Sequence, residues 1–132
     1  MASRRSRALG VFFLFLLFAA PIGAIAFGVL ATIAASLSNY DLGLLPITMA
    51  LAFIVISYAI GGLQAAFVGA VTAAAVWRNG RASIWLTLTA TGIAALVTLS
   101  RIHEGWDLTA ILIVVHLITA TACWLIARRA LM

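Results

Sequence analysis

The stretch AIGGLQAAFVGAVTAAAVW, residues 59–77, decides the fold, because it is a long apolar run built mostly from small residues. On a helical wheel, Gly62, Ala66, Gly69 and Ala73 lie within about 60° of one another and form one small-residue face. Helices in lipid associate through close approach of their backbones, which small residues permit. The stretch therefore predicts a membrane helix that packs tightly against a neighbour.

Two polar residues lie on the opposite side of the same helix. Gln64 projects away from the small-residue face, and Ser57, one heptad earlier, falls on the side of Gln64. Neither side is suited to lipid, since polar groups in the hydrocarbon core need hydrogen-bond partners. The helix is therefore expected to be central, with one neighbour on each side or with a second copy of the chain on one of them.

Composition places the whole chain in a membrane. Of its 132 residues, 66% are hydrophobic and 8% are charged, a balance that is not typical of a soluble domain. Four apolar runs, each near the ~20 residues that a spanning helix requires or longer, occupy residues 9–37, 47–76, 84–100 and 109–127. The predicted fold is an all-α integral membrane protein, a four-transmembrane-helix bundle forming a single transmembrane domain over residues 1–132, with no soluble domain.

The charged residues predict the orientation. Seven of the eight arginines precede the first run, separate the second from the third, or follow the fourth. The positive-inside rule therefore places both termini in the cytoplasm, and the expected location is the cytoplasmic (inner) membrane of a bacterium. Trp77, Trp85 and Trp124 fall at the same boundary, and Tyr40 and Trp106 at the other, as in an aromatic belt.

A cleavable export signal is an alternative reading of the first run. The basic start SRRSR and the apolar stretch Leu9–Ala20 fit such a signal. Residues 27–37, FGVLATIAASL, remain apolar, whereas a mature chain normally becomes polar soon after cleavage. This continuity favours a retained membrane helix.

The first two runs are longer than a bilayer requires. About 30 residues form about 45 Å of helix, against a hydrocarbon core of about 30 Å. Pro21 predicts a kink in the first helix and leaves the carbonyl of Leu17 without its helical donor. Gly61 and Gly62 mark the corresponding weak point in the second run.

Several polar residues fall at one depth near the middle of the predicted bilayer. Gln64, His116 and Thr98 lie about 16–21 Å from the cytoplasmic boundary, counted at 1.5 Å per residue. Thr91 shares a helix face with Thr98, and Thr87 and Ala94 continue that face. A hydrogen bond between Gln64 and His116 would satisfy both side chains. We therefore predict a polar layer of Gln64, His116, Thr91, Thr98 and Ser57, which is either structural or the lining of a path.

Cofactor and metal sites have weak support. His116 is an alternative ligand for a b-type haem or a neighbour of a quinone, but His103 lies in an outer loop at a different depth. His103, Glu104 and Asp107 match no zinc signature. The prediction is no metal and no cofactor, with haem through His116 as the alternative.

The sequence favours a non-catalytic protein, since it has no carboxylate within an apolar run, no glycine-rich phosphate loop and no evident nucleophile with its base. We expect an accessory or assembly subunit of a larger or homo-oligomeric membrane complex. The alternative is a small oligomeric transporter or channel. Expected partners are the lipid bilayer and other membrane subunits or a second copy; nucleic acid is not expected.

Overall fold

A computed structural model of the chain describes residues 3–38, 45–52, 54–100 and 106–131. Every regular element in these ranges is an α-helix, and no strand occurs among them. The helices are α1 (Arg4–Leu37), α2 (Leu45–Ala52), α3 (Ile54–Asn79), α4 (Ile84–Leu99) and α5 (Trp106–Ala130). The all-helical prediction is confirmed.

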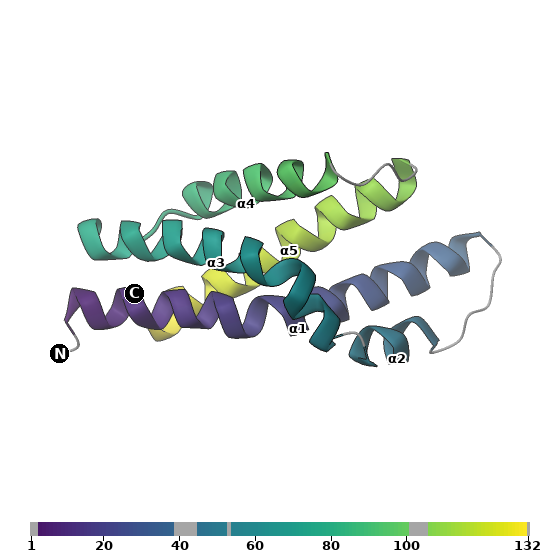
Figure 1. The fold of residues 1–132 in the computed structure, drawn as a ribbon, viewed down its shortest axis with the longest axis horizontal. Coiled ribbons are helices and arrows are strands. Elements are labelled where there is room, and N and C mark those ends of the chain that lie inside the picture. Colours follow the sequence, from purple (N-terminus) through teal and green to yellow (C-terminus); the bar gives the residue numbers. More distant parts are fainter. Residues whose placement is uncertain (1–2, 39–44, 53, 101–105, 132) are drawn as a thin grey trace.

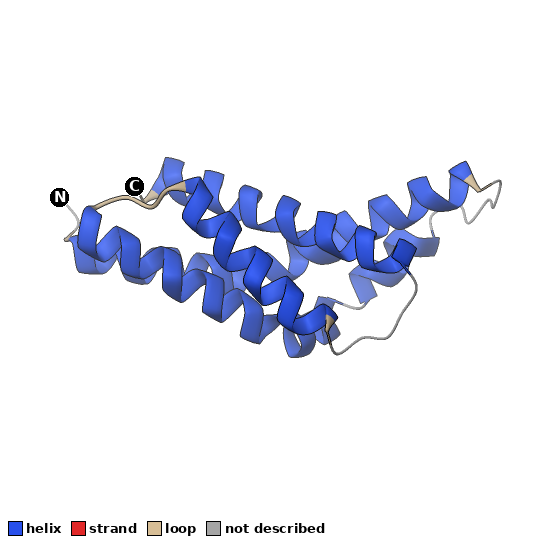
Figure 2. Ribbon diagram, turned by 90° about the horizontal axis from the view of Figure 1, so that it is seen from above, coloured by secondary structure: helices blue, strands red, loops and turns tan. Residues whose placement is uncertain are grey.

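The four long helices pack side by side in a ring. In the described ranges they contact one another in the cyclic order α1, α3, α4, α5 and back to α1, while the short α2 lies mainly against α1. Figures 1 and 2 show that both termini lie at the same end of this elongated arrangement. The helix of residues 59–77 does have neighbours on two sides, as expected, but so does each of the other long helices. It is therefore not uniquely central.

The second apolar run, predicted as one helix over 47–76, is helical throughout its described residues. These belong to α2, which ends at Ala52, and α3, which begins at Ile54, and residue 53 lies outside the described residues. Gly61 and Gly62, predicted as the weak point, lie inside α3.

The small-residue face contacts α1, but only over part of its length. A Cβ atom built on Gly69 would lie 3.0 Å from Cβ of Phe15 and 3.3 Å from the backbone oxygen of Phe12. A Cβ atom on Gly62 would meet nothing within 4 Å. The predicted close approach therefore occurs at Gly69 and is made within the chain, whereas Gly62 takes no part in it. Ala66 is half-buried.

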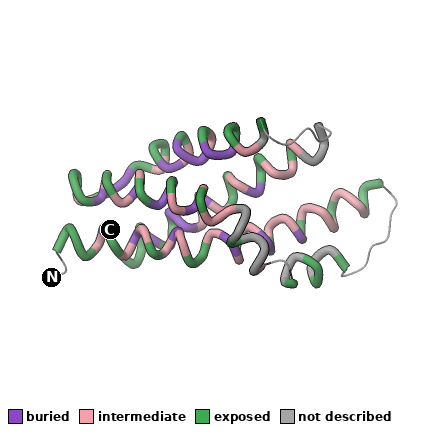
Figure 3. Tube along the Cα trace, viewed as in Figure 1, coloured by how far each residue is buried: buried purple, intermediate pink, exposed green. Residues whose placement is uncertain are grey.

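The most deeply buried side chains lie where the helices face one another (Figure 3). They include Val11 and Phe15 of α1, and Cys123 of α5. Trp124 is also buried, with 8% of its surface exposed, and its indole N–H donates to the carbonyl of Ala82 at 3.1 Å. The prediction that Trp124 belongs to the aromatic belt was therefore wrong, because this indole fastens α5 to the α3–α4 connection. Trp77 and Trp85 are exposed.

Two of the described helices are long and apolar enough to cross a membrane. They cover Arg4–Leu37 and Thr109–Ala130, and Ile84–Thr98 forms a shorter apolar helix. Large apolar side chains such as Leu63, Leu96 and Trp85 are exposed on the outside of the molecule. An exterior of this kind is suited to contact with lipid or with other apolar surfaces.

Candidate functional site

Three polar side chains from three helices meet inside the ring. Gln64 of α3 donates its amide N–H to Oγ1 of Thr98 on α4. Its Oε1 lies 2.6 Å from Nε2 of His116 on α5. The hydrogen bond predicted between Gln64 and His116 is therefore present, and Thr98 completes a group that we call the polar cluster.

The polar cluster joins helices whose backbones are apart. In the described ranges no Cα atom of α3 lies within 8 Å of a Cα atom of α5, since these two helices are diagonal in the ring. The long side chains of Gln64 and His116 cross that distance and are partly buried. A polar pair of this kind helps to fix the register of two helices whose backbones do not adjoin.

The ring of His116 has both nitrogens engaged. Nδ1 lies 2.6 Å from the backbone oxygen of Leu112, and Nε2 faces Oε1 of Gln64. The donor and acceptor roles of the two nitrogens depend on the tautomer of the ring. The Thr98 hydroxyl accepts from the Gln64 amide and donates to the carbonyl of Ala94 at 3.1 Å.

Threonines continue the inward face of α4. Thr87 and Thr91 are buried, as is Ala94, so the predicted face does point into the protein. The Thr91 hydroxyl donates to the carbonyl of Thr87 at 2.8 Å. The Oγ1 atoms of Thr87 and Thr72 lie 3.2 Å apart between α4 and α3. These bonds satisfy the hydroxyls locally, as ordinary packing residues do.

Thr72 is fully buried, and it was not identified as a candidate residue from the sequence. Its hydroxyl also donates to the carbonyl of Val68 at 2.8 Å. A lone threonine among alanines in residues 70–76 was the available signal.

The kink residue Pro21 lies inside α1, which continues through it. The carbonyl of Leu17, which proline deprives of its helical donor, accepts a hydrogen bond from the hydroxyl of Tyr58 on α3. The sequence predicted the free carbonyl but not the side chain that satisfies it. Tyr58 therefore ties α3 to α1 at the point where α1 lacks a backbone bond.

Other predicted residues give less information. Ser57 lies on α3, but its side chain is outside the described part of the structure, as are those of Trp106 and Asp107. Tyr40, His103 and Glu104 also lie outside the described residues. In the ranges that are described, no three His, Cys, Asp or Glu side chains come together as a metal ion would require.

Haem ligation through His116 would require a change in the polar cluster, since neither ring nitrogen is directed at open space. Comparison of the chain with protein families, with curated proteins and with solved structures finds no match.

Proposed function

We propose that the protein spans the cytoplasmic membrane four times, through α1, α3, α4 and α5, with both termini in the cytoplasm. In this membrane it serves as a non-catalytic accessory or assembly subunit, either of a larger complex or of a homo-oligomer. The apolar exterior and the two helices long enough to span support the membrane placement. The 26 residues of α3 are also sufficient for a crossing.

The orientation is supported by the placement of the arginines. Arg4 donates to the carbonyl of Arg78 at 3.5 Å, so the start of α1 and the end of α3 adjoin. Arg81 follows in the α3–α4 connection, and Arg128 and Arg129 lie in the last turn of α5. Just after that turn, Leu131 lies against α1, 3.1 Å from where a Cβ atom on Gly10 would be. We call this basic region the arginine end. An end of this kind belongs on the cytoplasmic side.

The observation that carries the subunit role is that the interior polar groups satisfy one another. Gln64, Thr98 and His116 are hydrogen-bonded within the chain, and Thr91 bonds its own helix. Among the described residues, the buried side-chain nitrogen or oxygen without a partner is Nε of Arg7, outside the polar cluster. Polar groups that are fully hydrogen-bonded to one another stabilise the fold. A substrate site would instead need hydrogen-bond donors or acceptors that are free to bind the substrate.

The partner is expected to be found by purification from native membranes in mild detergent, with mass spectrometry of the co-purifying chains and a visible absorption spectrum. A complex of fixed ratio, or a homo-oligomer without transport activity, agrees with the proposal. A monomer without partners contradicts it. A Soret band would place haem in the complex.

The orientation has an independent test with cysteine variants. Cys123 is fully buried, so an added cysteine reports with low background. A membrane-impermeant maleimide is expected to label Ser38→Cys in intact cells and Asn79→Cys only after permeabilisation. The reverse pattern would contradict the orientation, and equal labelling of both in intact cells would contradict the membrane placement.

A small oligomeric transporter or channel is the second candidate, and the meeting of Gln64, Thr98 and His116 inside the ring of helices favours it. Here the double variant Gln64→Leu with His116→Leu would abolish flux through proteoliposomes while leaving assembly intact. Under the subunit proposal, the same variant retains its partners and differs only in stability.

A further inference from the structure

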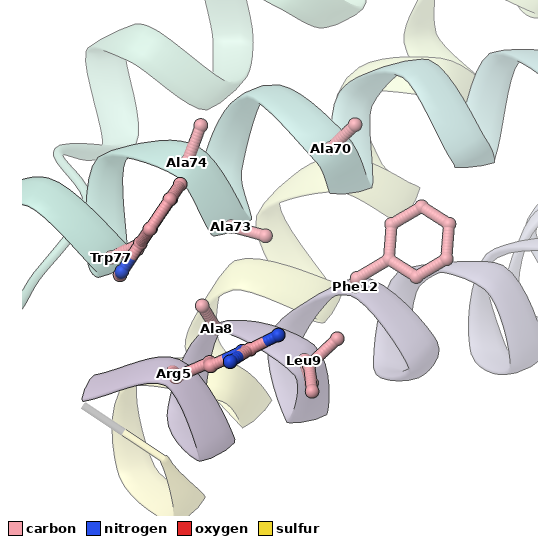
Figure 4. A pocket seen from close by; sticks show the side chains of 8 residues that line it. All are labelled: Arg5, Ala8, Leu9, Phe12, Ala70, Ala73, Ala74 and Trp77. Carbon is pink, nitrogen blue, oxygen red and sulfur yellow. The ribbon is translucent and has the colours of Figure 1, made fainter. Parts of the chain in front are cut away.

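A groove of about 630 Å³ runs between α1 and α3 at the arginine end (Figure 4). Its walls are apolar except at one end, where Arg5 and Trp77 lie. Phe12 lies toward the other end, nearer the middle of the helices (Figure 4). The volume is within the range of about 300–1,000 Å³ that is typical of sites for small molecules.

Small side chains create the groove. At Gly69 the two helices are in close contact, but closer to the arginine end α3 presents Ala73 and Ala74 to α1. Alanine side chains are too small to fill the space between the two helices, so an apolar volume stays open along Leu9. In a bilayer, a hydrocarbon chain is the molecule available to fill such a volume.

The positive charge at the end of the groove is complementary to an anion. Arg5 is exposed and lies beside the open volume. The three acidic residues of the chain occupy positions 41, 104 and 107, so none lies in the segments that form the arginine end. Among the described residues of the arginine end, no side-chain carboxylate is present to neutralise the guanidinium groups. Arginine is well matched to phosphate oxygens, which it binds through two parallel hydrogen bonds.

We propose that this groove binds one anionic phospholipid of the surrounding bilayer. Its phosphate lies against Arg5, its glycerol region lies beside Trp77, and one acyl chain follows the groove toward Phe12. The inference rests on the proposed membrane placement but not on the subunit role. Basic pockets between helices on the cytoplasmic side are suited to such headgroups.

The test uses full-length protein in detergent, titrated with phosphatidylglycerol or with phosphatidylcholine of the same acyl chains, with bound lipid counted by native mass spectrometry. Arg5→Gln is expected to weaken binding of phosphatidylglycerol about tenfold, equivalent to about 1.4 kcal/mol, and to weaken binding of phosphatidylcholine less, because the choline cation already neutralises the charge of that headgroup. Arg129→Gln is the control, since it removes the same charge from an exposed position outside the groove.

A groove-filling variant, Ala74→Phe, separates the acyl chain from the headgroup. It is expected to reduce binding of both lipids, with the helix content unchanged by circular dichroism. Ala74→Leu serves if the larger substitution prevents folding. Equal effects of Arg5→Gln and Arg129→Gln, or undiminished binding to the filled groove, would overturn the proposal. Protein that cannot be inserted into lipid nanodiscs at all would instead contradict the membrane placement.

Discussion

Replacing Gly69 by alanine tests the contact between α1 and α3 directly. The new Cβ atom would lie 3.0 Å from Cβ of Phe15 and 3.3 Å from the carbonyl oxygen of Phe12. Both atoms belong to or adjoin the backbone of α1, so no change of rotamer moves them away. The helices must separate instead, and overpacking of this kind costs about 1–3 kcal/mol.

The helical preference for alanine opposes this cost. Alanine is favoured over glycine inside a helix by about 1 kcal/mol. Gly69→Ala is therefore expected to lower the free energy of unfolding by about 1 kcal/mol, the difference between these two effects. Gly62→Ala is the matched control, because it lies on the same helix and its added Cβ meets nothing within 4 Å. This control is expected to be neutral or more stable than the unmodified protein.

The measurement is equilibrium unfolding in mixed micelles, followed by circular dichroism. The difference between the unfolding free energies of the two variants cancels the gain in helix propensity that they share. It leaves the cost of the overpacked contact, about 1–3 kcal/mol. If Gly69→Ala is as stable as Gly62→Ala, the two helices do not approach as closely as described. If Gly69→Ala changes only the oligomeric state, the small-residue face packs between copies of the chain rather than on α1.

Two further predictions concern the interior hydrogen bonds. Tyr58→Phe is expected to destabilise the protein by about 0.6 kcal/mol, the average for such bonds in membranes, and to have less effect in a Pro21→Ala background, where the carbonyl of Leu17 regains its backbone donor. Equal effects in both backgrounds would show that the hydroxyl acts elsewhere. His116→Leu is expected to lower the free energy of unfolding by up to about 1.7 kcal/mol. The effect is expected to be smaller when Gln64→Leu is also present, because the amide that would lose its partner is then absent. A simple sum of the two single effects in the double-mutant cycle would contradict the polar cluster.

The sequence predicted the helices well, because hydropathy and chain length largely determine where membrane helices form. It also predicted the Gln64–His116 pair, since two long polar side chains at one depth have few other partners in an apolar interior. Two residues at equal depth can lie on adjacent or on diagonal helices. The sequence therefore did not show that this pair would join two diagonal helices of the ring. The partner of Leu17 was missed for a similar reason: Tyr58 is 41 residues away, and only the rotation of α3 decides where its hydroxyl points.

Other features had no distinguishing pattern. A tryptophan near a helix end is equally typical of an exposed belt and of an internal anchor, and only packing distinguishes Trp77 from the buried Trp124. The close approach at Gly69 and the open space at Gly62 likewise depend on how far two helices diverge.

The bond from Tyr58 to the carbonyl of Leu17 has a consequence for biogenesis. A carbonyl that faces hydrocarbon without a donor is costly, and lipid offers none. In the proposed membrane placement, α1 would therefore enter the bilayer before α3 with one carbonyl unpaired at its proline. That carbonyl is satisfied only when the segment bearing Tyr58 has been synthesised and inserted beside it. The insertion machinery is thus expected to hold α1 until α3 arrives, rather than release it alone into lipid.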